Sequence, residues 1–336
     1  MAGTTAPERT GRHQGRDSRG IGHGTWAGPR LRVENLGIAF ATESAGRPPL
    51  RDVSFDVKHR QCVGLIGEAG AGKTLTARAL RPHLLPADAR LDGRVLLDGN
   101  DIAMQPPAPA DIHVLTRNPM DALNPVRTVG QQLTDAVRRR HDTSDRLARQ
   151  LAVEAMEQVG IPKPRSSLHQ YPHHFRAAMR HRLMAAAAVI DAPRVLVMDQ
   201  PAGVDDATQM TLTDLVCRIA EQAGSAVLLL SRNPALIAGH CHHLVSLHAG
   251  EVVESARTDD LLQRPAHPYT AALFGGQEDV GADGPAPAPA EGCLFRGRCA
   301  HAMAGCERTQ PMVVDQRGRR ARCWRHGELN LRAVGW

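Results

Sequence analysis

The sequence predicts an α/β fold around a largely parallel or mixed sheet, with a helical insertion. Short apolar runs of the buried-strand type occur at Cys62–Ile66, Val195–Met198 and Ala226–Leu230, and stretches of helical periodicity lie between them. Such alternation is typical of domains whose parallel strands are joined by helices. A glycine-rich segment follows the first apolar run, and Thr74–Leu80 after it has a helical pattern.

The composition allows a sizeable core with few aromatic contacts. The chain has 336 residues, of which 42% are hydrophobic and 3% aromatic, so its core must consist mainly of Ala, Val and Leu. This length predicts one large domain or two smaller ones. No apolar run reaches the roughly 18 residues that a membrane-spanning helix needs.

The formal net charge of +6 is concentrated at the two ends of the sequence. Residues 1–30 are rich in Gly and Arg without an apolar signal segment, and we expect a disordered basic tail there. Because residues 293–336 are also basic, the remaining sequence is slightly acidic. The basic pI therefore does not indicate a nucleic-acid partner. The basic ends read as solvated segments, with contact to an anionic membrane surface as the alternative.

The first third of the sequence reads mostly as strands. Leu31–Phe40 alternates enough to be a strand, and Val53–Val57 begins another. Arg94–Leu97 is expected to be a strand that enters the turn Asp-Gly-Asn at residues 98–100. Gln105–Ala110 is a loop rich in Pro and Ala.

The middle of the sequence is predicted to be helical. Helical spacing of apolar residues runs from Val129 to about Gly160 and again through Phe175–Ile190. Residues 118–190 are therefore expected to form a helical subdomain inserted into the sheet domain. Thr211–Ala223 is a further helix between two of the apolar strands.

These patterns divide the sequence into segments. Residues 31–276 are expected to form one domain, because strands and helices alternate throughout it. Residues 277–292 contain a Pro/Ala repeat that is typical of a linker. Residues 293–336 hold four of the seven cysteines and are expected to form a small C-terminal region.

The firmest feature is a phosphate-binding loop with the pattern G-x-x-x-x-G-K-[ST]. The glycines Gly67, Gly70 and Gly72 allow backbone N–H groups to curl around phosphate oxygens, and the next helix adds its N-terminal dipole. Lys73 is expected to reach the β- and γ-phosphates, and Thr74 to ligate Mg²⁺. The alternative, a glycine turn without a ligand, does not explain why Lys-Thr follows in the required place.

A second element supports a nucleotide site. Asp199 ends the apolar strand Val195–Met198, where a carboxylate can hold Mg²⁺ through its water shell. This aspartate alone would be a weak signal, but together with the phosphate loop it predicts ATP and Mg²⁺ as ligands.

Further segments resemble a known family. They are residues 118–125 (Asn-Pro-Met-Asp-Ala-Leu-Asn-Pro), 171–173 (Tyr-Pro-His), 267–270 (His-Pro-Tyr-Thr) and the Cys-rich C-terminal region. From about Leu31 to Cys323 the sequence resembles the ATPase subunits of the dipeptide/oligopeptide (and nickel) ABC importers. This resemblance implies a P-loop NTPase fold of the ABC type with a helical subdomain.

The resemblance also implies partners and a location. Two such domains meet head to tail, and each ATP lies between the phosphate loop of one and the signature loop of the other. Closure on ATP drives two membrane-spanning permease chains, and an extracytoplasmic solute-binding protein delivers the peptide. The chain is then peripheral, on the cytoplasmic face of the cell membrane. Phe40 is at about the position of the family's adenine-stacking aromatic residue. The equal alternative is that Phe40 is a core residue of its strand.

Several catalytic positions depart from the family pattern. The glutamate that polarises the attacking water is Gln200 here, and an amide cannot accept a proton at neutral pH. The switch histidine falls at Arg232, which offers charge but no proton shuttle. The Mg²⁺-sensing glutamine falls at Arg117, where a cation would repel the metal.

The signature Leu-Ser-Gly-Gly and the loop after the Mg²⁺ site are also changed. The signature reads Phe-Arg-Ala-Ala, so Arg176, Ala177 and Ala178 replace the serine hydroxyl and the closely approaching glycines. Residues 202–206 keep only the final aspartate, Asp206. These departures predict a degenerate ATPase that binds ATP and turns it over poorly or not at all.

Three functional readings follow. The chain is a transport subunit that pairs with a second, different ATPase; or it is a regulatory pseudo-ATPase that grips ATP without turnover. The third is an ABC protein without permeases, against which the importer-type C-terminal region argues.

The C-terminal cysteines predict a metal. Cys293, Cys299, Cys306 and Cys323 have the spacing C-x5-C-x6-C-x16-C, and four thiols in a short segment of a cytosolic protein indicate metal rather than disulfides. In the family that the sequence resembles, this region can carry a [4Fe-4S] cluster, and four thiolates suit it. Zn²⁺ is the alternative. The other three cysteines are expected to be buried thiols.

Overall fold

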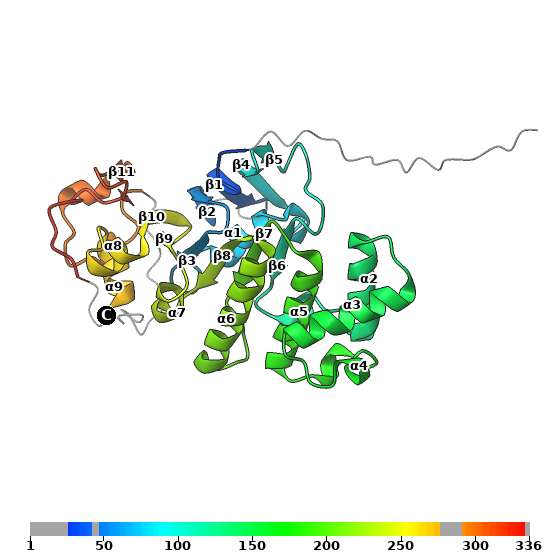
Figure 1. Ribbon diagram of the computed structural model, residues 1–336. Helices are drawn as coiled ribbons and strands as arrows, with labels where there is room; N and C mark the ends of the chain where they lie inside the picture. The colour runs from blue at the N-terminus through cyan, green and yellow to red at the C-terminus, as the bar shows by residue number, and fades with distance from the viewer. Residues whose placement is uncertain (1–25, 42–46, 276–290, 333–336) are drawn as a thin grey trace, which may run out of the picture.

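The protein contains two β-sheets, and helices surround the larger one (Figure 1). The computed structural model describes residues 26–41, 47–275 and 291–332. The smaller sheet has the antiparallel strand order β2-β1-β4-β5. Its strands are β1 (Leu31–Phe40), β2 (Leu50–Val57), β4 (Ala89–Leu97) and β5 (Asn100–Asp101).

The larger sheet contains the predicted parallel core. Its strand order is β11-β12-β10-β9-β3-β8-β7-β6, in which β9 to β6 run parallel and β10, β12 and β11 add an antiparallel edge. Its strands are β3 (Cys62–Ile66), β6 (Ile112–Leu115), β7 (Val195–Asp199), β8 (Ala226–Ser231), β9 (His243–His248), β10 (Glu251–Arg257), β11 (Val313–Val314) and β12 (Arg320–Ala321). The three predicted apolar strands β3, β7 and β8 are fully buried, as expected for parallel strands covered on both faces.

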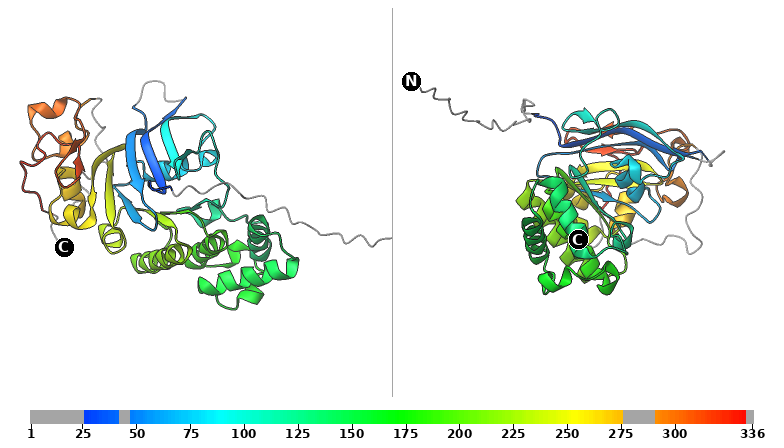
Figure 2. Two further views of the ribbon diagram at one scale, coloured as in Figure 1. Left: turned by 45° about the horizontal axis from the view of Figure 1, so that its top comes forward. Right: turned by 90° about the vertical axis from the view of Figure 1, so that its right-hand side faces the viewer.

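The helices surround this parallel core. They are α1 (Lys73–Ala79), α2 (Val129–Arg140), α3 (Asp145–Gln158), α4 (Pro164–Ser167), α5 (Ala177–Asp191), α6 (Asp206–Ala223), α7 (Pro234–Ala238), α8 (Thr258–Gln263) and α9 (Pro268–Phe274). The left view of Figure 2 shows the green helices α2 to α4 at one end of the molecule and the orange and red C-terminal region at the other. No helix in the described ranges is long and apolar enough to cross a bilayer.

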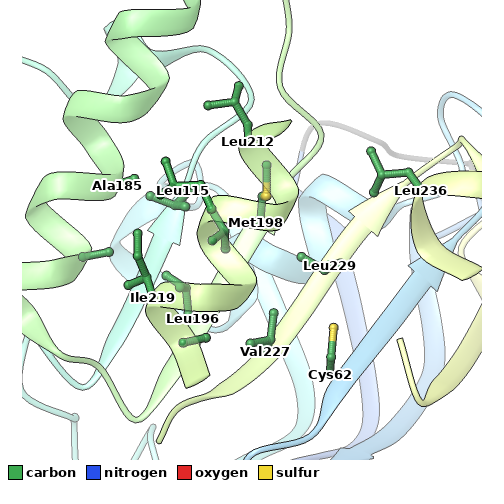
Figure 3. Close-up of a cluster of buried hydrophobic side chains, with 14 of the residues drawn as sticks. Cys62, Leu115, Ala185, Leu196, Met198, Leu212, Ile219, Val227, Leu229 and Leu236 are labelled. Atoms are coloured by element: carbon green, nitrogen blue, oxygen red, sulfur yellow. The ribbon is translucent and has the colours of Figure 1, made fainter. Parts of the chain in front are cut away.

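Successive side chains of β7 enter two different cores. Leu196 and Met198 join a cluster with α5 and α6 that includes Ala185 and Ile219 (Figure 3). Val195 and Val197 point the other way, into a second cluster between the two sheets. This alternation follows from the two-residue repeat of a strand, and burial on both faces holds the end of β7 in place.

The predicted helical stretch from Val129 to about Gly160 consists of the two helices α2 and α3. Ser144 ends the connection between them, because its side chain accepts the N–H of Leu147 and caps α3. The first helix, α2, starts at a capping box formed by Thr128 and Gln131. Local side-chain hydrogen bonds therefore divide a continuous apolar pattern.

Other element boundaries also differ from the sequence prediction. Helix α5 starts at Ala177, because Phe175 follows a short 3₁₀ turn in extended conformation. Helix α6 starts before the predicted Thr211, because Asp205 accepts the N–H of Thr208 and caps it. Strand β4 starts at Ala89 rather than at Arg94, because its polar first half pairs with β1.

Parts of the predicted tail and linker lie outside the described residues. These parts are residues 1–25 and 276–290. The division into a tail, one domain with a helical subdomain, a linker and a Cys-rich region stays a prediction.

Candidate functional site

The carboxyl ends of four neighbouring parallel strands meet at one edge of the larger sheet. The strands β3, β7, β8 and β6 lie side by side in register. The phosphate loop follows β3, Asp199 ends β7, Arg232 follows β8, and Arg117 lies two residues after β6. Ligands of open α/β sheets bind in the crevice outside these ends. The fold therefore brings together four predicted site elements that are far apart in the sequence.

The phosphate loop connects β3 to α1 and requires glycine for two different reasons. Gly70 and Gly72 have φ angles of +78° and +104°, which other residues rarely adopt. A Cβ on Gly67 would lie 2.2 Å from the backbone oxygen of Leu247, and one on Gly72 would lie 2.4 Å from Leu50 Cδ2. The loop therefore packs closely against β9 and β2, which holds its backbone close to the sheet.

The lysine and threonine of the phosphate loop both form hydrogen bonds to protein atoms. Lys73 Nζ donates to the backbone oxygens of Gly67 and Glu68, at 2.6 and 2.8 Å. Thr74 Oγ1 donates to Asp199 Oδ2 at 2.6 Å. The oxygens of Thr74 and Asp199 thus lie side by side, and a hard cation such as Mg²⁺ prefers oxygen ligands of this kind.

The site is strongly cationic around Asp199. Burial lowers the pKa of Lys73 to about 8; the charge of Asp199 opposes this shift, and Arg117 and Arg232 add to it. Burial also raises the pKa of Asp199, against the hydrogen bond from Thr74 and the charge of Arg117. Neither Arg117 nor Arg232 makes an ion pair or a side-chain hydrogen bond within the described ranges. These cations suit a polyphosphate, but Arg117 disfavours a metal ion next to it.

Gln200 is fixed by hydrogen bonds at both ends of its amide. Its Oε1 accepts the backbone N–H of Arg232, and its Nε2 donates to Gln209 Oε1, both at 3.1 Å. Gln209 is buried in α6 and in turn donates to the backbone oxygen of Val204. The side chain of Gln200, at the predicted catalytic position, therefore connects the end of β7 to Arg232 after β8 and to Gln209 in α6. It has no basic atom that could accept a proton.

The predicted signature segment begins α5. Arg176 is the exposed N-cap residue and makes no side-chain capping bond, and Ala177 and Ala178 form the first turn. In the part of the chain that the structure describes, no hydrogen bond joins this segment to the phosphate loop. Its predicted contact with a nucleotide on a second subunit stays a prediction.

Two other predicted site residues lie apart from these hydrogen bonds. Asp206 is the first residue of α6, and its neighbour Asp205 accepts the capping bond instead. Phe40 ends β1 opposite Ala89 and packs, partly buried, against the core between the sheets. The roles predicted for Asp206 and Phe40 stay predictions.

Comparisons with known proteins agree with this geometry. Residues 50–203 match the family "ABC transporter", and residues 253–306 match "Oligopeptide/dipeptide transporter, C-terminal region". The chain is 32% identical over 324 residues to the dipeptide transport ATP-binding protein DppD of Bacillus subtilis, covering 90% of this chain and 97% of that protein. This chain belongs to the ATP-binding proteins of the ABC transporter family. It is also 30% identical over 314 residues to DppD of Escherichia coli, covering 87% and 95% of the two chains.

Solved structures support the fold of this ABC ATP-binding protein. The cbiO1 structure from Clostridium perfringens, part of the ABC transporter complex cbiONQ, matches with a TM-score of 0.58 and 18% identity. It covers 70% of this chain and 90% of that chain. The ATP-binding cassette MJ0796 bound to ADP and Pi gives a TM-score of 0.58 and 17% identity, covering 68% and 98%. The predicted ABC-type P-loop fold is confirmed.

Sequence reasoning missed one group that touches the phosphate loop of this ABC protein. Arg298 of the C-terminal region donates to both carboxylate oxygens of Glu68, at 2.9 and 2.6 Å. Tyr269 of α9 accepts the backbone N–H of Glu68 at 3.0 Å. Glu68 and Arg298 are 230 positions apart, and no local pattern in the sequence connects them.

The four C-terminal cysteines are close together in the fold. Cys293, Cys299, Cys306 and Cys323 line one small cavity, and all are free thiols. Burial raises the pKa of Cys293 and Cys299, and raises that of Cys323 to about 11. Among the described residues, no three His, Cys, Asp or Glu side chains are arranged to hold a metal ion. The predicted Fe–S cluster or Zn²⁺ is therefore not shown and stays a prediction.

Proposed function

We propose that this chain is the ATP-binding subunit of a peptide importer and that it binds ATP but hydrolyses it poorly. The observation that carries the proposal is that, at one edge of the sheet, the nucleotide-binding residues are intact and the catalytic residue is replaced. The loop with Lys73 and Thr74 is intact, whereas Gln200 is held by Gln209 and Arg232. Binding and chemistry use different residues of this edge, so one can persist without the other.

The intact half of the site has what a triphosphate needs. Backbone N–H groups of a glycine-rich loop and a helix N-terminus attract phosphate oxygens. Lys73 already lies over the loop, bound to two of its carbonyls, and moves to phosphate oxygens when a nucleotide enters. Thr74 and Asp199 supply oxygens for Mg²⁺. Mg²⁺, when bound, neutralises charge on the β- and γ-phosphates.

The altered half lacks a proton acceptor for the attacking water. Hydrolysis needs a residue that positions this water and takes up its proton. The amide of Gln200 has no basic atom, and the guanidinium of Arg232 stays protonated. Loss of one general base typically reduces a rate by about 10²–10⁴-fold.

The names of relatives support permease partners for this chain, because these relatives are a dipeptide transport ATP-binding protein and a putative peptide import ATP-binding protein. The chain acts with two membrane permeases on the cytoplasmic face, supplied by an extracytoplasmic binding protein. A cavity of about 270 Å³ between β6, α2 and α5 lies next to residues 122–124 and suits a short permease segment. Because its Arg-Ala-Ala signature would weaken a partner's site, we propose pairing with a second, different ATPase subunit.

A regulatory pseudo-ATPase is the second candidate. The hydrogen bonds of Gln200 favour it, because they give this side chain a structural role that does not depend on turnover. In this case ATP binding stabilises the dimer, and the partner subunit supplies all hydrolysis.

The C-terminal thiols carry a separate proposal, a [4Fe-4S] cluster with Zn²⁺ as the alternative. Its support is that one cavity is lined by Cys293, Cys299, Cys306 and Cys323. Four thiolates are the ligand set of such a cluster. Iron, sulfide and zinc analysis of anaerobically purified protein tests this, and metal-free protein rules out both.

Phosphate release tests the main proposal. The wild type is compared with Lys73→Ala, which removes the phosphate-binding lysine, and with a variant that restores the family residues. That variant carries Arg117→Gln, Gln200→Glu, Arg232→His, Phe175→Leu, Arg176→Ser, Ala177→Gly and Ala178→Gly. We expect the wild type to bind ATP and to release phosphate only slightly faster than Lys73→Ala, and the restored variant to exceed the wild type at least tenfold; wild-type release no faster than that of Lys73→Ala favours the pseudo-ATPase. Wild-type turnover close to that of the restored variant contradicts the proposal.

A further inference from the structure

The C-terminal region touches the phosphate loop through one ion pair. Arg298 Nη2 lies 2.6 Å from Glu68 Oε1, and Nη1 lies 2.9 Å from Oε2, so the contact is bidentate. Only 16% of the Arg298 side chain and 21% of the Glu68 side chain are exposed. Bidentate, partly buried pairs of this kind fix geometry far better than exposed pairs do.

An aromatic group holds Arg298 in position. Its guanidinium lies 5.3 Å from the ring centre of Phe295. The Phe295 ring packs edge-on against Tyr269 and His248, with ring centres 5.5 and 5.6 Å apart. Tyr269 and Phe295 are almost completely buried. The guanidinium of Arg298 therefore packs on an aromatic platform, formed by the rings of Phe295, Tyr269 and His248, that is part of the core.

The same platform binds the backbone of the loop. The N–H of Glu68 donates to Tyr269 Oη at 3.0 Å, and Tyr269 Oη donates to the backbone oxygen of Leu247 at 3.2 Å. Lys73 also donates to the backbone oxygen of Glu68. Glu68 is therefore held through its backbone N–H, its backbone oxygen and its carboxylate, and the carboxylate bond comes from the C-terminal region.

We propose that Arg298 is a positioning residue of the nucleotide site, holding the phosphate loop through Glu68 so that the C-terminal region sets the affinity for ATP. This inference rests on the ATP binding in the proposed function and is independent of turnover. A loop that is held in its binding shape loses less conformational freedom when the phosphates bind. Arg298 also neutralises the carboxylate of Glu68, whose negative charge acts on the phosphate-binding Lys73.

A double-mutant cycle on the full chain tests this proposal, with a non-hydrolysable ATP analogue as the probe. We expect Arg298→Ala to weaken binding of the analogue about tenfold and Glu68→Ala to weaken it severalfold. The Kd of the double variant should not exceed the larger of the two single-variant Kd values. Non-additivity of this kind is the mark of two residues that act through their mutual contact. Arg296→Ala is the matched control, because Arg296 lies in the same turn and its side chain, among the described residues, donates to the backbone oxygen of Glu291 and not to the phosphate loop. It should stay within twofold of the wild type.

Each contrary result has a distinct meaning. Unchanged affinity in folded Arg298→Ala overturns the proposal. Tighter binding by Glu68→Ala, with wild-type affinity in the double variant, also overturns it, because the effect is then charge repulsion alone. If Arg298→Ala does not fold, Arg298→Lys keeps the charge, and an unchanged Kd in that variant overturns the proposal. A wild type that fails to bind the analogue overturns this proposal and the proposed ATP binding together, whereas wild-type turnover contradicts only the proposed loss of hydrolysis.

Discussion

Gln200 Nε2 donates to Gln209 Oε1 at 3.1 Å, across the space between the end of β7 and helix α6. The same amide accepts the backbone N–H of Arg232. A carboxylate at this position could keep the second bond but could not donate to Gln209. The residue at the predicted catalytic position is therefore part of the structure that joins three elements.

Restoring the acid alone should not restore turnover. In Gln200→Glu, Arg232 and the Arg-Ala-Ala signature remain, and the donor to buried Gln209 is lost. We expect unchanged phosphate release and a loss of about 1 kcal/mol in unfolding free energy, as for one buried hydrogen bond. Phosphate release and the thermal midpoint measure the two effects. A tenfold gain in turnover would contradict this assignment of Gln200.

Two glycines of the phosphate loop should respond differently to alanine. A Cβ at Gly67 meets the backbone oxygen of Leu247 at 2.2 Å, whereas a Cβ at Gly70 meets nothing within 4 Å. We expect Gly67→Ala to abolish ATP binding, because a backbone atom cannot move aside. In Gly70→Ala the only cost is the left-handed backbone conformation, about 1–2 kcal/mol, so the affinity for ATP should fall about 5- to 30-fold. Equal losses in both variants would show that the loop packs differently.

Removal of Mg²⁺ should weaken ATP binding only modestly. Arg117 and Arg232 place positive charge near Lys73, where phosphate charge would otherwise require the metal. We expect Kd for ATP in excess EDTA to rise by less than about tenfold, equivalent to 1.4 kcal/mol. The Arg117→Gln variant should depend more strongly on Mg²⁺ than the wild type does. Complete loss of wild-type binding in EDTA would show that the arginines do not act on the phosphates.

His248 should make the protein sensitive to acid. Burial lowers its pKa to about 4 from an ordinary value of 6.5, with the charge of Glu68 opposing the shift. Between these values the unfolded chain binds the proton and the folded chain does not, so stability falls as pH drops through this window. At pH 5 the loss is about 2 kcal/mol.

The comparison with His248→Phe isolates this effect. Phenylalanine keeps the ring beside Tyr269 and Phe295 but does not titrate. Burial raises the pKa of Glu254 to about 7, which acts in the opposite direction, but it does so equally in both proteins. Between pH 7.5 and pH 5 the thermal midpoint of the wild type should fall further than that of His248→Phe. Parallel curves would exclude His248 as the cause.

Local patterns predicted the parallel half of the fold and the phosphate loop. The runs at β3, β7 and β8 are apolar throughout because both sheet faces are covered, so they are visible in the sequence. The loop is defined by eight neighbouring residues. Asp199 was found because it follows such a run directly.

The features that the sequence did not predict depend on contacts between distant residues or on single capping hydrogen bonds at helix starts. The polar half of β4 is a strand only because β1 pairs with it. Ser144 and Asp205 set helix starts by one hydrogen bond each. The pair of Glu68 and Arg298 joins positions 230 residues apart, which no periodicity reveals.

The identity of the bound nucleotide tests the central claim most directly. The purified chain is incubated with ATP and Mg²⁺, and the nucleotide that stays bound is extracted and separated into ATP and ADP, with Lys73→Ala as the control for retention. We predict that the wild type retains nucleotide, that Lys73→Ala does not, and that the retained nucleotide is still ATP after hours. A bound pool that is mainly ADP would contradict the claim that this chain binds ATP but hydrolyses it poorly.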